Sequence, residues 1–157
     1  MQDDLGSKYL KLERDGPIAW CIIDRPEAKN ALTPAMYFGI QKAIKLVTHD
    51  PNLHALIITG TGDSFAPGGD MGKETDPNEL KIGGQLGSGV LPFRAILNSS
   101  IPVISAVNGH CQGGGFVIAL LSDIAVISEK AKLRVPELLR GFADSYYASI
   151  LTAHVGV

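Results

Sequence analysis

The sequence predicts one domain of the α/β class, and three observations support this prediction. The chain has 157 residues, close to the roughly 150 residues of a typical domain. Apolar residues make up 45% of the chain and charged residues 19%, as in globular chains that bury a core. Segments typical of strands and of helices alternate along the sequence, which is the pattern of an α/β fold.

The first elements are a hairpin and a helix. Residues 9–13 alternate in polarity, Asp15-Gly16 supplies a turn, and residues 18–23 form an apolar run, which predicts two paired strands. Thr33-Pro34 provides an N-cap and a first-turn proline, and the helix should stop at Asp50-Pro51. Its core face repeats at helical spacing and consists of Met36, Ile40, Ala43, Ile44 and Val47.

The middle of the chain predicts two buried strands and a second helix. The strands cover 53–59 and 102–107, and each leads into a loop that contains glycine. The apolar run 116–121 follows three glycines, and its alanine and leucine content favours a helix that stops at Asp123. Between the two strands, residues 72–89 are rich in glycine and polar side chains, so we expect a mobile segment beside a site.

The last predicted elements are a short strand at Leu133 and Val135, broken by Pro136, and a helix capped by Asp144. No later segment follows to cover the apolar side of that helix, so we expect a partner subunit there or a longer parent chain. This side consists of Tyr147, Ile150, Leu151 and His154.

Charge and composition exclude several classes of partner. The formal net charge is −2, from 14 basic and 16 acidic side chains, and no basic run exists to attract nucleic acid or an anionic membrane. Cys21 and Cys111 form no disulfide framework. The first 16 residues lack a signal-peptide apolar core, and no apolar run reaches membrane-spanning length. We expect a soluble protein of the reducing cytoplasm.

Common motifs of nucleotide and metal chemistry are absent or weak. Residues 60–65 match a dinucleotide fingerprint poorly, because Phe65 stands where its last glycine should be. The sequence contains no phosphate-binding Gly-Lys-Ser/Thr loop and no nucleophile elbow. Its four histidines show neither HExxH spacing nor a cluster with cysteine, so we expect no metal.

Two glycine clusters are the strongest functional signal. Residues 65–70 read Phe-Ala-Pro-Gly-Gly-Asp, and residues 108–115 end in three glycines that open the expected helix. A helix start leaves backbone N–H groups unpaired, and glycine lets a ligand approach them closely. If N–H groups of both clusters converge, they form an oxyanion hole, although each cluster alone is also typical of tight turns.

Four ordered motifs together resemble the crotonase superfamily, also called the enoyl-CoA hydratase/isomerase family. Residues 25–32 (RPEAKNAL) resemble its R-P-x-x-x-N-A-L segment, and residues 60–70 resemble its G-x-G-x-x-F-x-A-G-x-D segment. Residues 106–115 resemble A-V-N-G-x-x-x-G-G-G, and residues 122–124 match its Ser-Asp-Ile. The resemblance covers residues 9–157.

The resemblance implies the fold, the ligand and the assembly. The fold would be a spiral of β-β-α repeats formed by residues 1–157 as a single acyl-CoA-binding domain, the N-terminal core of the family fold. The family's C-terminal helical extension would be absent from this chain. The substrate would be an acyl-CoA thioester, as in fatty acid metabolism, with CoA as part of the substrate and no separate cofactor. The assembly would be a homotrimer or hexamer.

The resemblance also assigns site residues. The two oxyanion N–H donors fall on Gly69 and Gly114. The residues that correspond to parts of the family's binding site for CoA and the acyl chain are Lys29, Ala31, Leu32, Gly68, Asp70, Met71, Gly113 and Val117.

Two family glutamates map to Val117 and Glu137, so one of the pair is missing. Hydration of a double bond uses two carboxylates, whereas double-bond migration needs one base that moves a proton between two carbons. Glu137 is therefore expected to be the acid-base residue of an isomerase-like site, with Asp144 as a weaker second acid. The alternatives are a true hydratase, a non-catalytic CoA-thioester-binding homologue, or a protein-interaction or RNA-binding role that the negative charge disfavours.

Overall fold

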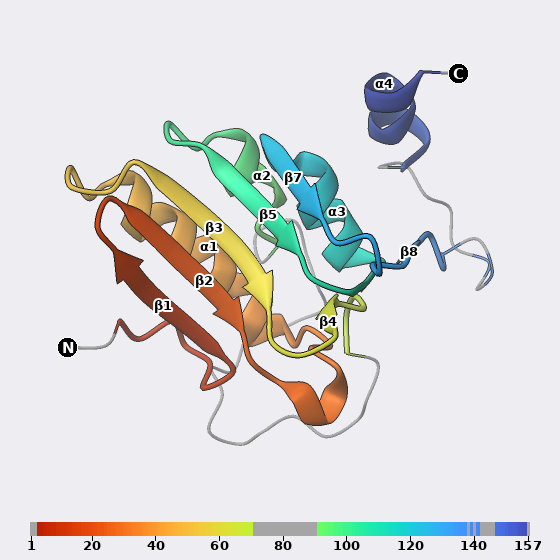
Figure 1. Ribbon diagram of the computed structural model, residues 1–157, viewed down its shortest axis with the longest axis horizontal. Coiled ribbons are helices and arrows are strands. Elements are labelled where there is room, and N and C mark those ends of the chain that lie inside the picture. Colours follow the sequence, from red (N-terminus) through yellow and green to blue (C-terminus); the bar gives the residue numbers. More distant parts are fainter. Residues whose placement is uncertain (1–2, 71–90, 138, 140, 142–146, 157) are drawn as a thin grey trace.

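The computed structural model describes residues 3–70, 91–137, 139, 141 and 147–156, and it confirms the α/β class. A five-stranded sheet has the order β1-β2-β3-β5-β7 (Figure 1). Strands β1 and β2 form the antiparallel hairpin, and the other neighbours are parallel. The strands are β1 (Leu10–Asp15), β2 (Ile18–Ile23), β3 (Ala55–Gly60), β5 (Val103–Val107) and β7 (Ile124–Ile127).

A second, smaller sheet contains β4 (Ser64–Ala66), β6 (His110–Gln112) and β8 (Leu133–Arg134), which pair in parallel. Each of β3, β5 and β7 is followed by one of these short strands. A helix then follows β4 and β6 before the chain returns to the large sheet. This order confirms the expected repetition of β-β-α units.

Three helices cover one face of the large sheet (Figure 1). They are α1 (Pro34–Thr48), α2 (Phe93–Leu97) and α3 (Gly114–Leu121). The predicted start of α1 is confirmed, because the Thr33 hydroxyl accepts a hydrogen bond from the Met36 N–H at 3.2 Å. A 3₁₀ turn, η1 (Pro26–Ala28), connects β2 to α1.

The core lies between the large sheet and these helices. Alternate residues of β2 and β5 are buried, such as Cys21, Ile23 and Val103, while their neighbours Trp20 and Ile104 stay half-exposed on the other face. Alternation of this kind means that the helices cover one face of the sheet, while the other face is left open by the part of the chain that the structure describes. No helix of the described part is long and apolar enough to cross a membrane.

Several predicted boundaries are wrong by one or two residues. Asp15 pairs with Ile18, so the hairpin turn is Gly16-Pro17. Val135 lies outside β8. The expected helix from Asp144 appears instead as a π-helical turn, η3 (Tyr147–Leu151), followed by α4 (Thr152–Val155).

The side of the last helical segment is less open than expected. Ile150 and Leu151 are partly buried and pack against the core, and His154 is exposed with its Nδ1 2.9 Å from the Ile150 carbonyl oxygen. The cap position Asp144 and the expected mobile segment 72–89 lie outside the described residues. This helix therefore gives less support to a subunit contact than the sequence pattern indicated.

Candidate functional site

The two glycine clusters meet where β4 and β6 lie side by side. An added Cβ on Gly68 would lie 3.2 Å from the Gln112 carbonyl oxygen and 3.4 Å from the Gly114 nitrogen. Strands β4 and β6 pair in parallel. The loop after each strand leaves from its carboxyl end, so the two loops lie side by side. The structure thus places next to each other Gly68 and Gly114, which are 46 residues apart in the sequence.

The first proposed donor, Gly69, lies in a short bridge to Leu32. The Leu32 N–H donates to the Gly68 carbonyl and the Asp70 N–H donates to the Leu32 carbonyl, both at 2.8 Å. Successive N–H groups of extended backbone point to opposite sides. The Gly69 N–H therefore points away from Leu32.

The second proposed donor, Gly114, is the first residue of α3. The Val117 N–H donates to the Gly113 carbonyl at 3.0 Å, which is the first bond of the helix. The N–H groups that precede it have no acceptor within the helix. The Gly114 N–H is therefore free of the helix ladder, and it adjoins Gly68 from the other loop.

Glu137 brings its carboxylate to the same place from the segment after β8. Its Oε1 lies 3.2 Å from the position that a Cβ on Gly113 would occupy. Its Oε2 is buried and has no hydrogen-bond partner among the described residues. Because a buried polar atom normally has a partner, an unpartnered oxygen on a carboxylate that adjoins the Gly113 backbone is typical of a ligand site.

Arg25 connects the two chain segments that the resemblance predicts for CoA binding. Its guanidinium donates to the Ala31 carbonyl at 2.9 Å and to Asp70 Oδ2 at 2.7 Å. The same group lies over the Tyr9 ring, 5.1 Å from its centroid. Burial lowers the pKa of Arg25, but the hydrogen bond and charge of Asp70 outweigh burial and raise it.

Asn30 connects the loop that contains Arg25 to the chain around Thr61 and Ser64. It has a left-handed backbone (φ 64°), as does Lys29 (φ 51°), and its side chain is fully buried. Its Oδ1 accepts from the Arg25 N–H at 2.8 Å, and its Nδ2 donates to the carbonyls of Thr61 and Ser64 at 3.0 and 2.6 Å. One amide therefore connects the loop after β2 to the loop between β3 and β4.

Tyr37 is a further site neighbour, and it extends from the first turn of α1. An added Cβ on Gly114 would lie 2.1 Å from the Tyr37 hydroxyl oxygen. Burial, and to a lesser degree the charge of Glu137, raise the pKa of Tyr37 well above its usual range. The phenol is thus a neutral O–H donor at every ordinary pH.

The structure brings most, but not all, of the predicted site residues together. Gly68, Gly69, Gly113, Gly114 and Glu137 form one cluster, and Ala31, Leu32 and Asp70 adjoin it through the bonds described above. Lys29 is exposed.

The remaining candidates are Val117, Met71 and Asp144. Val117 is buried in the core one turn into α3. Met71 and Asp144 lie outside the described residues.

Sequence reasoning missed the roles of Arg25, Asn30 and Tyr37. The sequence identifies Arg25 and Asn30 only as residues of a family motif. Their hydrogen bonds could not be predicted, because their partners Asp70 and Ser64 are more than 30 residues away. Tyr37 adjoins the apolar stripe of α1, so its position alone indicates a core residue. No local signal distinguishes it.

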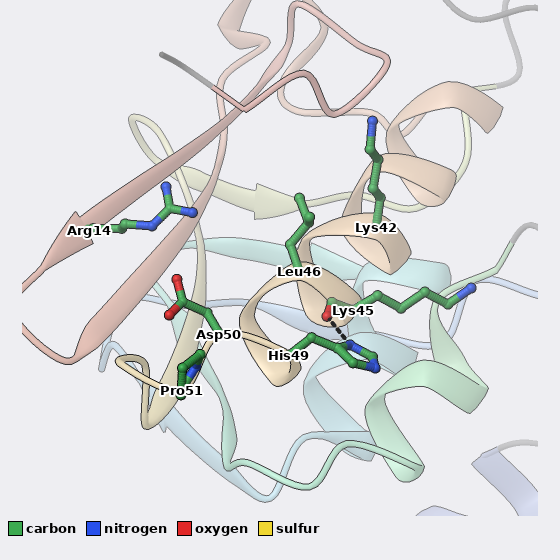
Figure 2. A pocket seen from close by; sticks show the side chains of 7 residues that line it. All are labelled: Arg14, Lys42, Lys45, Leu46, His49, Asp50 and Pro51. Carbon is green, nitrogen blue, oxygen red and sulfur yellow. Dashed lines mark hydrogen bonds between the residues drawn. The ribbon is translucent and has the colours of Figure 1, made fainter.

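The groove shown in Figure 2 lies elsewhere, between β1 and the C-terminal half of α1. Arg14 pairs with Asp3 at 2.6 Å, and His49 Nδ1 lies 2.7 Å from the Lys45 carbonyl oxygen. The described residues hold no group of three His, Cys, Asp or Glu side chains that could bind a metal ion. The groove is lined by Arg14, Lys42, Lys45, Leu46, His49, Asp50 and Pro51.

A coil of β-β-α units with two adjoining glycine backbones defines a protein of the crotonase class. A family model described as enoyl-CoA hydratase/isomerase matches residues 13–157. The chain belongs to the enoyl-CoA hydratase/isomerase family.

Curated relatives carry hydratase and dehydratase names. A mevalonyl-coenzyme A hydratase of Aspergillus fumigatus is 40% identical over 124 residues, 77% of this chain and 45% of the relative. A crotonyl-CoA hydratase of Syntrophomonas wolfei is 37% identical over 138 residues, 86% of this chain and 52% of the relative. A carnitinyl-CoA dehydratase of Salmonella enteritidis is 36% identical over 135 residues, 86% of this chain and 51% of the relative. The chain spans about half the length of these relatives.

Solved structures agree with the fold. An enoyl-CoA hydratase/isomerase from Pseudoalteromonas atlantica superposes with a TM-score of 0.83 at 28% identity, over 96% of this chain and 59% of that one.

Proposed function

We propose that the protein is an acyl-CoA thioester enzyme that moves a proton at the carbon next to the thioester carbonyl. The observation that carries this proposal is the Glu137 carboxylate, whose Oε1 lies beside Gly113 and whose buried Oε2 has no hydrogen-bond partner among the described residues. Family membership supports the substrate class, because the curated relatives are named for acyl-CoA chemistry.

The proposed reaction is migration of a double bond in an enoyl-CoA. The Glu137 carboxylate removes a proton from C2 of a 3-enoyl thioester, and the electron pair moves onto the thioester oxygen. The N–H groups of Gly69 and Gly114 stabilise that negative charge, as donors in an oxyanion hole do. Glu137 then returns the proton to C4, so no atom is gained or lost.

The apolar side chain at Val117 favours this reaction over hydration. Val117 is 5% exposed and packs in the core, and it offers no group that could hold or deprotonate water. A single carboxylate suffices for a proton transfer between two carbons of one substrate.

Hydration by Glu137 alone is the second candidate function. It is favoured by the printed names of the relatives, which are hydratases and dehydratases. The two candidates share the oxyanion hole and the base, and they differ in whether water enters the site. A non-catalytic thioester-binding protein is the third candidate, and the missing glutamate at Val117 favours it.

We propose that the CoA part of the substrate lies along the segment from Lys29 to Leu32 and along Asp70. Support comes from the Arg25 side chain, which ties the Ala31 carbonyl to Asp70 and so fixes the two segments relative to each other. Met71 is proposed for the same surface on the resemblance alone.

We also propose that copies of the chain assemble, as the family resemblance implies for a trimer or hexamer. The support in the structure is an open, apolar sheet face, described in the Discussion. No nucleic-acid or membrane partner is proposed.

Exchange of Glu137 for glutamine tests the proposed base. Glu137→Gln keeps the shape of the side chain and removes its basicity, so turnover of a 3-enoyl-CoA should fall about 100-fold or more. Glu129→Gln, at an exposed glutamate, is the matched control and should keep full turnover. Full activity of Glu137→Gln would contradict the assignment, and lack of any turnover in the unmodified protein would favour the non-catalytic candidate.

A further inference from the structure

The side chain of Tyr37 fills the space behind the Gly114 backbone. The three atoms nearest to a Cβ added at Gly114 all belong to Tyr37: the hydroxyl oxygen at 2.1 Å, Cζ at 3.0 Å and Cε1 at 3.2 Å. Tyr37 is 2% exposed. Its hydroxyl therefore packs directly against the Gly114 Cα, and only glycine fits there.

The peptide between Gly113 and Gly114 is held from both ends. The Glu137 carboxylate lies beside Gly113, and the Tyr37 hydroxyl lies beside Gly114. The N–H of Gly114 belongs to this peptide. The carbonyl of this peptide accepts from the Val117 N–H at 3.0 Å, which sets the peptide plane. The contact with the Tyr37 hydroxyl limits the remaining tilt of the Gly114 end, and with it the direction of the N–H.

A buried tyrosine at this position destabilises the fold relative to phenylalanine unless its hydroxyl makes a useful contact. Burial of a hydroxyl costs free energy that a phenylalanine ring of the same shape would avoid. The raised pKa of Tyr37 means that the group stays an uncharged phenol beside Glu137. Negative charge from a phenolate therefore never competes with the carboxylate or with a thioester oxyanion.

We propose that Tyr37 is a positioning residue for the oxyanion hole: its hydroxyl, packed against Gly114, sets the direction of the Gly114 N–H. The inference rests on the proposed function, because the N–H needs a direction only if it binds a thioester oxygen. Tyr37 itself does not touch the reacting atoms, and it acts through the backbone of Gly114.

The first test removes the hydroxyl alone. Tyr37→Phe should lower kcat for a 3-enoyl-CoA about tenfold and leave KM within about twofold, since small misplacements of a catalytic group affect the transition state most. Ile40→Val is the matched control, because Ile40 is fully buried one turn further along α1 and its variant loses packing without altering the contact to Gly114. It should keep kcat.

A spectroscopic measurement reports the N–H direction without turnover. Butanoyl-CoA, a saturated thioester that has no double bond to move, is the probe. Its carbonyl stretching frequency should fall on binding to the unmodified protein, and Tyr37→Phe should return the frequency part of the way toward its value in water. A residue that only supports folding would leave the frequency of the bound carbonyl unchanged.

Reciprocal rescue tests the contact itself. Gly114→Ala places a methyl group on the Tyr37 hydroxyl and should lower kcat about 100-fold, comparable with loss of an oxyanion donor. Adding Tyr37→Phe removes the colliding atom, so the double variant should be about tenfold faster than Gly114→Ala alone. Gly115→Ala collides instead with the Ala66 carbonyl at 2.2 Å, and Tyr37→Phe should not rescue it.

The outcomes separate the inference from the proposed function. If the unmodified protein neither shifts the carbonyl frequency nor converts enoyl-CoA, both fail. If it does both, and Tyr37→Phe changes neither kcat nor the frequency, the positioning role of Tyr37 is wrong while the proposed function stands. Absence of rescue in the double variant would also overturn the inference.

Discussion

Single side chains at the site hold together segments that are far apart in the sequence. Asn30 is the clearest case, because it bonds to Arg25, Thr61 and Ser64 at once. Asparagine tolerates the left-handed conformation that this position adopts, at lower cost than most residues. The resemblance marks Asn30 as a motif residue, but its contacts depend on folding of the β3–β4 loop, so they could not be predicted from the sequence.

Asn30→Ala should lower the free energy of unfolding by about 2–4 kcal/mol. The variant leaves three backbone groups without their buried partner and places alanine in a strained conformation. Chemical denaturation measures the change. Asn52→Ala, at an exposed turn, serves as the control and should change stability by less than about 0.5 kcal/mol. Equal stability of the Asn30 variant and the unmodified protein would contradict this account.

The thiols of the two cysteines are predicted to be unreactive in the folded protein. Burial raises the pKa of Cys21 and of Cys111 to about 12, so the reactive thiolate is nearly absent at pH 8. A colorimetric thiol reagent should therefore find no fast-reacting thiol before denaturant is added and two afterwards. Raising the pH from 7 to 9 should leave the folded protein unreactive. Rapid reaction of either thiol in the folded state would show that its burial is wrong.

At the scale of elements, long periodic segments were predictable and short ones were not. The hairpin, α1, β3, β5 and α3 follow from apolar periodicity and capping residues. Strands β4 and β6 have three residues each, too few for alternation to identify a strand, whereas β8 was predicted with its end one residue too late. Strand β7 was missed because its four residues, Ile-Ala-Val-Ile, are all apolar and show no alternation in the sequence.

Helix α3 contains Val117, the position at which the family resemblance places one of the two glutamates of a hydratase. Val117 is the fourth residue of α3, and its side chain lies in the core. Val117→Glu should lower the free energy of unfolding by about 2–4 kcal/mol, because it buries a carboxylate. The same variant should raise the ratio of 2-enoyl-CoA hydration to 3-enoyl-CoA isomerisation.

Val117→Gln is the matched control for this variant, since glutamine has the size of glutamate without its basicity. Steady-state assays with both substrates measure the ratio. If Val117→Gln changes the ratio as much as Val117→Glu does, the carboxylate is not the cause.

The face of the large sheet that the described residues leave uncovered is apolar. Trp20, Ile57, Ile104 and Ile124 form a row across four neighbouring strands, by the registers of β2, β3, β5 and β7. Figure 1 shows the helices on the opposite face. Contiguous apolar patches of this kind commonly mark protein contacts. This face supports the assembly proposed above better than the last helical segment does.

We therefore expect self-association through the open sheet face. Light scattering should give a mass above that of one chain, and the emission of Trp20, the one tryptophan, should shift to shorter wavelength as the concentration rises. Ile57→Lys should reduce both effects. Leu97→Lys also replaces an exposed apolar residue, 62% exposed on α2, and should reduce neither. A monomeric mass at every concentration would contradict the expectation.

We propose that one carboxylate, Glu137, performs proton transfer on an enoyl-CoA beside an oxyanion hole. The most direct test measures two rates of the unmodified protein side by side: isomerisation of a 3-enoyl-CoA and hydration of the 2-enoyl-CoA of the same chain length. The account predicts that isomerisation is at least about tenfold faster, and that Glu137→Gln abolishes it. Hydration as fast as isomerisation, or isomerisation that survives in Glu137→Gln, would contradict the claim.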